Sequence, residues 1–143
     1  EEITIVPTLL QDEIISPTVF TQALEEAKSS EWMKRNLTHP KIIRKPWSFK
    51  GHEYQTQIAN DTAPFVSVIK SSQVGVSQLF ANVALALTTL HPGETIIYVL
   101  PTTGFARKFT NSRLNPIIES SPLLSGMVNK AADSTELKRI GNS

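Results

Sequence analysis

The chain has 143 residues, of which 40% are hydrophobic, and its 14 basic and 13 acidic residues give a formal net charge of +1. This length suits one domain with a sizeable core, and the balanced charge neither demands nor excludes a nucleic-acid partner. Because the chain has no cysteine, disulfides and thiolate metal sites are excluded, and its three histidines lie too far apart in sequence to favour a zinc site.

The sequence predicts neither a membrane span nor a signal peptide. It contains no run of about 18 apolar residues, the length needed to cross a bilayer. It begins with Glu1 and Glu2, whereas a signal peptide begins with basic and then apolar residues. Because it lacks an initiating Met and ends without a recognisable element, we expect it to be part of a longer protein or a trimmed form of one.

The first predicted element is an amphipathic helix. Ser16 and Pro17 are typical of a helix start, with a hydroxyl N-cap and proline at the first helical position. Apolar residues then recur at helical spacing to about Asn36.

A basic connector follows over residues 37–51, with Trp47 and Phe49 among its lysines and its arginine. Basic residues mixed with aromatics can bind nucleic acid. The favoured interpretation is a solvated linker whose rings dock on the next domain. We assign residues 1–45 to an N-terminal arm with this helix and basic linker.

From residue 46 onward the pattern alternates between strands and helices. Short β-branched apolar runs predict buried strands over 65–69 and 95–100. Between them, an apolar helix is predicted over 77–90, after a short one over 52–60. This order is typical of a parallel sheet covered on both faces. Further helices are predicted from Thr102 or Thr103 to about Ser112 and from Asn115–Pro116 to before Pro122, and a final strand over 135–140.

The loop between the first strand and the apolar helix carries the clearest chemistry. In a standard P-loop, Gly, four residues and Gly-Lys-Ser/Thr join a strand to a helix; backbone N–H groups and the lysine hold phosphates, and the hydroxyl binds Mg²⁺. Here Gly75 and Ser77 match the second glycine and the hydroxyl, whereas Lys70 replaces the first glycine and Val76 the lysine. Lys70 has a stem long enough to supply an ammonium from the other end of the loop. The alternative is an ordinary turn, in which Gly75 relaxes the backbone and Ser77 caps the helix.

The loop sequence Lys-Ser-Ser-Gln-Val-Gly-Val-Ser over residues 70–77 resembles the deviant Walker A loop of the large terminase subunits of tailed bacteriophages, of the lambda-like type. In that branch the lysine stands at the start of the loop, and an apolar or aromatic residue replaces the usual one. The strand ending in Pro-Thr, the arginine, and the Asn-Pro and Ser-Pro pairs within residues 96–122 are also similar to this family. Tyr54–Gln55 resembles its adenine-recognising element. The similarity covers roughly residues 46–143.

This resemblance implies the fold and the site. The implied fold class is α/β, a helicase-like P-loop NTPase with a parallel sheet and flanking helices, incomplete in this chain, and residues 46–143 are its N-terminal part. The implied cofactors are ATP and Mg²⁺. The candidate nucleotide-binding residues are Lys70, Ser71, Ser72, Gln73, Val74, Gly75, Val76, Ser77, Tyr54 and Gln55.

The resemblance also assigns a role to individual candidates. Lys70 is expected to supply phosphate-binding charge, and Ser77 is expected to bind the metal ion. Tyr54 is expected to stack on adenine and Gln55 to hydrogen-bond its edge. The alternatives are a solvated loop lysine, a plain N-cap serine and a surface Tyr-Gln pair. Arg113 is interpreted as an ordinary surface or helix-end arginine, and the alternative is that it faces phosphate or DNA.

The implied function is the ATP-binding part of a motor that translocates double-stranded DNA into capsids. The full-length protein would be an ATPase with a nuclease domain outside this chain. Its partners would be double-stranded DNA, the portal protein, the small terminase subunit and further copies of itself, in the cytoplasm of the infected host and without a membrane.

The chain departs from the family pattern in two ways. Some members carry an arginine inside the loop, where this chain has Ser72 or Gln73. No apolar run ending in Asp-Glu occurs, so the carboxylates that position Mg²⁺ and water are missing. We therefore expect this segment alone not to hydrolyse ATP. Two alternatives stay open: another helicase-like or recombination ATPase with a degenerate loop, and a non-catalytic interaction module.

Overall fold

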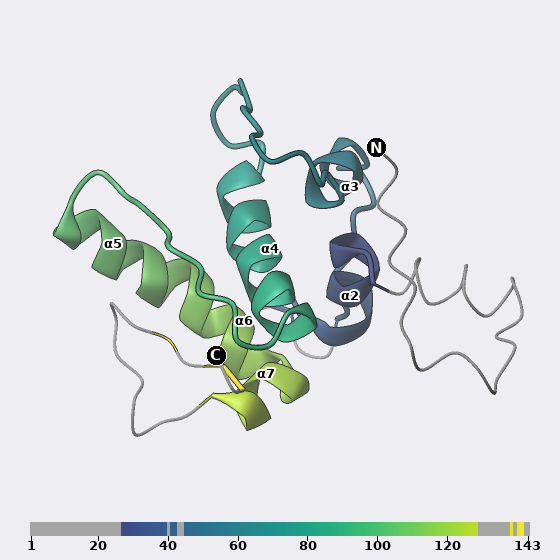
Figure 1. Ribbon diagram of the computed structural model, residues 1–143, viewed down its shortest axis with the longest axis vertical. Helices are drawn as coiled ribbons and strands as arrows, with labels where there is room; N and C mark the ends of the chain where they lie inside the picture. The colour runs from purple at the N-terminus through teal and green to yellow at the C-terminus, as the bar shows by residue number, and fades with distance from the viewer. Residues whose placement is uncertain (1–26, 40, 43–44, 129–137, 139, 142–143) are drawn as a thin grey trace, which may run out of the picture.

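The computed structural model describes residues 27–39, 41–42, 45–128, 138 and 140–141 (Figure 1). The start of the first predicted helix therefore lies outside the described residues, as does most of the last predicted strand. The described elements, in chain order, are α2 (Ser29–Asn36), α3 (Tyr54–Ala59), α4 (Val76–Leu90), α5 (Thr103–Phe109), the π-helix η1 (Thr110–Leu114), α6 (Asn115–Ser120) and α7 (Pro122–Met127).

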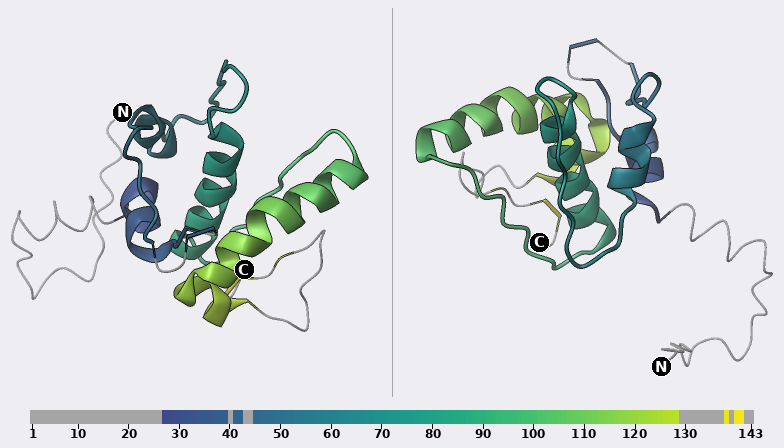
Figure 2. Two further views of the ribbon diagram at one scale, coloured as in Figure 1. Left: turned by 180° about the vertical axis from the view of Figure 1, so that it is seen from behind. Right: turned by 90° about the horizontal axis from the view of Figure 1, so that it is seen from above.

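Helix α4 is the centre of the fold. Helices α2 and α3 contact it on one side, and the rod formed by α5, η1 and α6 crosses it on the other (Figures 1 and 2). The sequence predicts α4 closely, as an apolar helix over 77–90. Leu79, Leu85 and Ala86 are buried on its inner face, and the helix ends where the N–H of His91 donates to Leu87 (2.8 Å).

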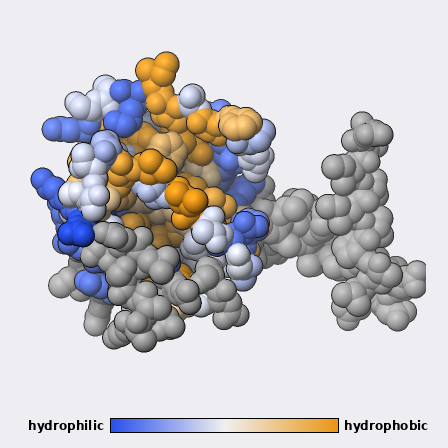
Figure 3. Space-filling model, turned by 60° about the vertical axis from the view of Figure 1, so that its left-hand side comes forward, coloured by the Kyte–Doolittle hydropathy of each residue, from blue (hydrophilic) through white to orange (hydrophobic). Residues whose placement is uncertain are grey.

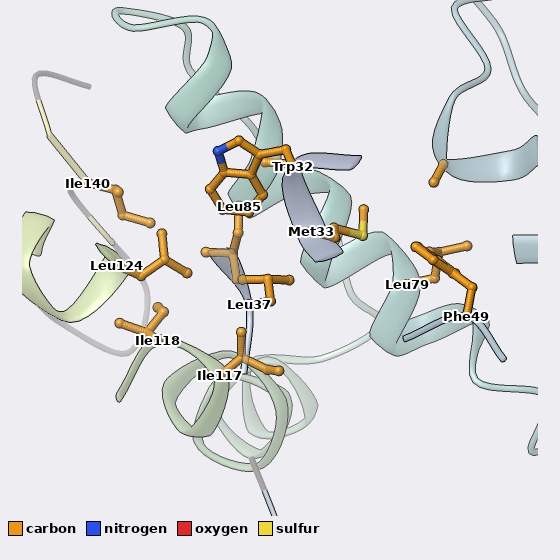
Figure 4. Close-up of a cluster of buried hydrophobic side chains, with 12 residues drawn as sticks. Trp32, Met33, Leu37, Phe49, Leu79, Leu85, Ile117, Ile118, Leu124 and Ile140 are labelled. Carbon is orange, nitrogen blue, oxygen red and sulfur yellow. The ribbon is translucent and has the colours of Figure 1, made fainter. Parts of the chain in front are cut away.

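A single cluster of apolar side chains joins these helices (Figure 4). Trp32 and Met33 of α2 belong to this cluster with Leu79 and Leu85 of α4, and Ile117 of α6 and Leu124 of α7 lie at its other end. Met33, Leu79, Ile117 and Leu124 have no exposed surface. The described part of the predicted N-terminal arm thus shares its core with the region after residue 46. The domain boundary itself stays a prediction.

The start of α2 differs from the predicted helix. Lys28 has an extended backbone (φ −65°, ψ 134°) and stands at the N-cap position. A helix that began near Ser16 therefore cannot run through Lys28 to Asn36 without interruption. The end at Asn36 is confirmed.

The segment from α5 to α6 is one continuous rod rather than two capped helices. Thr102 caps its start, as predicted, by accepting a hydrogen bond from the N–H of Phe105 (3.2 Å). The predicted helix from Asn115–Pro116 to before Pro122 is confirmed as α6, but no break separates it from the preceding helix, because Leu114 stays helical (φ −76°, ψ −56°). Proline lacks an N–H and crowds the carbonyl four residues earlier, here that of Ser112. The π-helical turn immediately before Pro116 makes room for it.

The predicted parallel sheet is absent from the part of the chain that the structure describes. Its only β-pairings are two isolated antiparallel bridges, Thr38 with Pro46 and Val128 with Ile140. The α/β prediction for these residues is therefore wrong. Strand composition favours a pleated, half-buried surface rather than fixing the backbone by itself, and neither predicted strand has a neighbouring strand among the described residues.

The two expected strands are instead irregular and exposed. Phe65 and Ile69 of the first are 94% and 102% exposed, and Ile97 and Val99 of the second are 82% and 83% exposed. Figure 3 shows apolar side chains gathered on one face of the described region. Tyr98 is the partial exception: it stacks on Phe109 of α5, with ring centroids 5.0 Å apart, and burial raises its pKa.

Adjacent leucines in α7 test the core. Leu124 is fully buried, whereas Leu123 is 40% exposed. We expect Leu124→Ala to lower the free energy of unfolding by about 2–5 kcal/mol, since it leaves a cavity in the cluster. Leu123→Ala, the same chemical change one residue away, should cost about 1 kcal/mol or less. Denaturant unfolding measures both, and equal losses would contradict the packing described.

Candidate functional site

The loop before α4 has an unusual backbone. Gln73 has φ 61°, and Gly75, at the N-cap position of α4, has φ 77°. The left-handed region costs a residue other than glycine about 1–2 kcal/mol. Turns of this kind direct backbone N–H groups into concavities that bind anions. The first N–H groups of α4 add to this, because a helix leaves them without intrahelical partners.

The upstream pair Tyr54–Gln55 lies directly against this loop. Tyr54 Oη donates a hydrogen bond to the carbonyl oxygen of Val74 (2.5 Å), and Gln55 Nε2 donates to the same oxygen (3.0 Å). Gln55 is only 4% exposed, and Tyr54 is 47% exposed. The structure thus brings together two candidate elements that lie about 20 residues apart in the sequence. To reach an adenine edge, Gln55 Nε2 would have to leave Val74.

Gly75 is required here for two separate reasons. Its φ lies in the left-handed region, and a Cβ at this position would stand 2.9 Å from Gln55 Nε2. The lack of a side chain therefore lets Gln55 approach the loop backbone. The loop conformation and the position of Gln55 depend on each other.

The two residues expected to carry charge and metal lie at opposite ends of the loop. Lys70 is exposed, and its Nζ donates to the neighbouring carbonyl of Ser71 (3.2 Å). Ser77 is exposed in the first turn of α4, two residues after the N-cap residue Gly75. The alternative role of Ser77 as the N-cap is therefore excluded, and its hydroxyl is accessible to a ligand.

The remaining loop candidates separate into exposed and buried residues. Ser71, Ser72 and Gln73 are exposed, and Val74 is half-buried. Val76 stands where a standard P-loop has its lysine, but it is 3% exposed and faces the interior. A lysine at that position would bury an ammonium, which is costly without a partner. This is a structural reason for an apolar residue at position 76.

Two contacts behind the loop were not anticipated from the sequence. Gln78 Nε2 donates to Asn82 Oδ1 (3.0 Å) and also approaches the carbonyl of Arg113 in η1 (3.5 Å). Asn82 is fully buried, and its Nδ2 has no partner in the described part of the chain. The only sequence signal was polar residues in an apolar helix. This pair ties the first turns of α4 to the π-helical turn.

A short turn positions α3. The N–H of Gly51 (φ 82°) donates to Glu53 Oε1 (2.9 Å), immediately before Tyr54. This hydrogen bond lowers the pKa of Glu53, with smaller contributions from the N–H of Glu53 itself and from His52. The ionised Glu53 thus helps to hold the turn that leads to the Tyr54–Gln55 pair.

Residues 46–141 match the family model of the phage terminase large subunit gpA, ATPase domain. The chain belongs to this family. The match spans more than half of the chain and contains both the loop and the Tyr54–Gln55 pair. No curated protein and no solved structure matches. As a terminase ATPase region, the chain is part of a phage DNA-packaging ATPase that uses ATP in a phage-infected cell.

Among the described residues of this terminase region, no helix is both long enough and apolar enough to span a bilayer. The described His, Asp and Glu residues form no group of three that could hold a metal ion.

A pair of glycine substitutions tests the geometry of the terminase loop. We expect Gly75→Ala to destabilise the protein by at least about 1–2 kcal/mol, since the new Cβ is strained at positive φ and collides with Gln55. Gly104→Ala is the matched control: it lies in α5 with nothing within 4 Å of a new Cβ. That change should stabilise the protein by roughly 0.5–1 kcal/mol. Denaturant unfolding measures the stability of both variants. A Gly75→Ala variant as stable as the wild type would refute this loop conformation.

The lowered pKa of Glu53 predicts a pH dependence. The unfolded chain binds a proton at Glu53 more readily than the folded chain does. The ionised Glu53 therefore stabilises the fold above the ordinary glutamate pKa of about 4.3. This stabilisation is lost as pH falls through the lower pKa that Glu53 has in the folded chain. Glu53→Gln should remove that part of the acid-induced loss of stability. Unfolding measured between about pH 6 and pH 3 would show parallel curves for both proteins if Glu53 made no such contribution.

Proposed function

We propose that the loop over residues 70–77 is a deviant Walker A loop that binds ATP for a DNA-packaging motor. The observation that carries this proposal is the double hydrogen bond from Tyr54 and Gln55 to Val74. These two bonds join the Tyr54–Gln55 pair, which is expected to bind adenine, to the loop that is expected to bind the phosphates. An ordinary turn between a loop and a helix does not require such a contact.

The groups present fit a nucleotide phosphate chain. Backbone N–H groups at the start of α4 and the left-handed turns at Gln73 and Gly75 suit phosphate oxygens. Lys70 is exposed, and its ammonium, which donates to the carbonyl of Ser71, can turn toward the γ-phosphate end. Tyr54 has an exposed ring for an adenine to stack on.

Ser77 fits the role of one protein ligand to Mg²⁺. Its hydroxyl is exposed beside the phosphate-binding N–H groups. Magnesium is often held by few protein groups together with nucleotide phosphates and water, and when bound it would neutralise phosphate charge. Hydrolysis further requires a carboxylate that orients water. We propose that this carboxylate and a nuclease domain lie outside this chain, so that the segment alone is inactive.

In the full motor, ATP binding and release would shift the loop and move double-stranded DNA. The proposed partners are DNA, the portal protein, the small terminase subunit and further copies of the same chain, in the host cytoplasm. The contact of Gln78 with Arg113 offers one physical route from the loop to η1.

A calorimetric titration with Mg²⁺ and a slowly hydrolysed ATP analogue tests the assignment. Lys70→Ala should weaken binding at least about tenfold, a loss of roughly 1.4 kcal/mol. Lys108→Ala is the matched control, because Lys108 is an exposed lysine in α5, and it should leave the affinity unchanged. Equal affinities for the two variants would remove Lys70 from the site. A wild-type chain that binds no nucleotide would contradict the proposed function.

A further inference from the structure

A second charged feature lies outside the nucleotide loop. Between Trp32 and His52 the sequence contains no acidic residue, but it holds six of the 14 basic residues: Lys34, Arg35, Lys41, Arg44, Lys45 and Lys50. The centre of this stretch, residues 38–50, is here called the basic hairpin. A chain with a net charge of +1 therefore has a strongly asymmetric local distribution of charge.

Backbone hydrogen bonds hold the basic hairpin together. Thr38 and Pro46 form an antiparallel bridge. The N–H of His39 donates to the carbonyl of Lys45 (2.7 Å), and the N–H of Trp47 donates to that of Leu37 (2.9 Å). The described residues at the two ends of the hairpin are thus paired with each other.

Two serines fix the base of the hairpin to the core. The N–H of Thr38 donates to Ser121 Oγ (3.0 Å), and Ser120 Oγ donates to the carbonyl of Thr38 (3.0 Å). Ser121 is fully buried, and the flanking Leu37 and Phe49 are 2% and 5% exposed. The basic hairpin is therefore attached to the junction of α6 and α7.

The aromatic rings of the hairpin are already engaged with each other. Trp47 stacks on His39 (centroids 6.4 Å apart, interplanar angle 20°) and meets Phe49 edge to face (6.5 Å, 83°). Nonspecific binding of single strands uses exposed rings on which bases stack. Here the stack stiffens the hairpin, and Phe49 is buried. The feature therefore suits a phosphate backbone better than unstacked bases.

The lysines face outward. Lys41, Lys45 and Lys50 are all exposed, and among the described residues none of them forms an ion pair with a carboxylate. We propose that the basic hairpin contacts the phosphate backbone of double-stranded DNA through Lys41, Lys45 and Lys50, without reading base sequence. The choice of DNA as the polyanion rests on the proposed packaging function. Lysine acts at such a surface as a point charge that releases counterions.

The test is DNA binding in the absence of nucleotide, so that a failed nucleotide site cannot affect it. The 143-residue chain is titrated against a fluorescent duplex of about 30 base pairs over a range of salt concentrations, with two unrelated sequences and a single strand of equal length. Each phosphate contact adds roughly 0.9 to the slope of log affinity against log salt. Lys41→Gln/Lys45→Gln should therefore lower that slope by about 2, equally for both sequences.

The control carries the same change in net charge elsewhere. Lys28→Gln/Lys108→Gln alters two exposed lysines outside the hairpin and should leave the slope near that of the wild type. Equal slopes for the two double variants would overturn the proposal, as would a wild-type chain that does not bind the duplex at low salt. A preference for the single strand would also overturn it, in favour of base stacking.

Discussion

The structure depends on the burial of α4 between two groups of helices. Helix α4 contacts α2 and α3 on one side and η1, the middle of the α5–η1–α6 rod, on the other. Because a packed helix cannot rotate without exposing Leu79 and Leu85, its N-terminus is fixed in space. Gly75, with its left-handed backbone, and the buried Val76 lie at this end of α4, so their positions are fixed with it. The loop over residues 70–77 is thus held by the core of the protein.

The contact between Val74 and the Tyr54–Gln55 pair adds a second restraint on the same loop. The carbonyl of Val74 accepts two hydrogen bonds from α3, and Gly75 leaves the space that Gln55 needs. Because Gln55 is almost fully buried, leaving its amide unpaired would be costly. A conformational change in the Tyr54–Gln55 pair therefore alters the loop, and a conformational change in the loop alters the pair. Reciprocal coupling of this kind suits a site whose occupancy must be sensed elsewhere.

The basic hairpin and the Tyr54–Gln55 pair are joined by a short stretch of chain. The hairpin ends at Phe49 and Lys50, and the N–H of His52 donates to the carbonyl of Phe49 (2.8 Å). The turn held by Glu53 then leads directly into α3 and the Tyr54–Gln55 pair. A proposed DNA contact and a proposed nucleotide contact thus lie at the two ends of one ordered segment, an arrangement that suits a motor.

The sequence by itself determined the helices with strong local signals, the Thr102 cap, the glycine in the loop and the family. These follow from periodicity, capping chemistry and a motif, all of which act over a few residues. Only the tertiary structure decided that residues 65–69 and 95–100 are not strands, because a strand exists through its neighbours. It also decided that the helix opening at Asn115–Pro116 continues the preceding helix without a break, and that Val76 faces the core. The contact between Gln55 and Val74 joins residues 19 positions apart, and no local pattern specifies such a meeting.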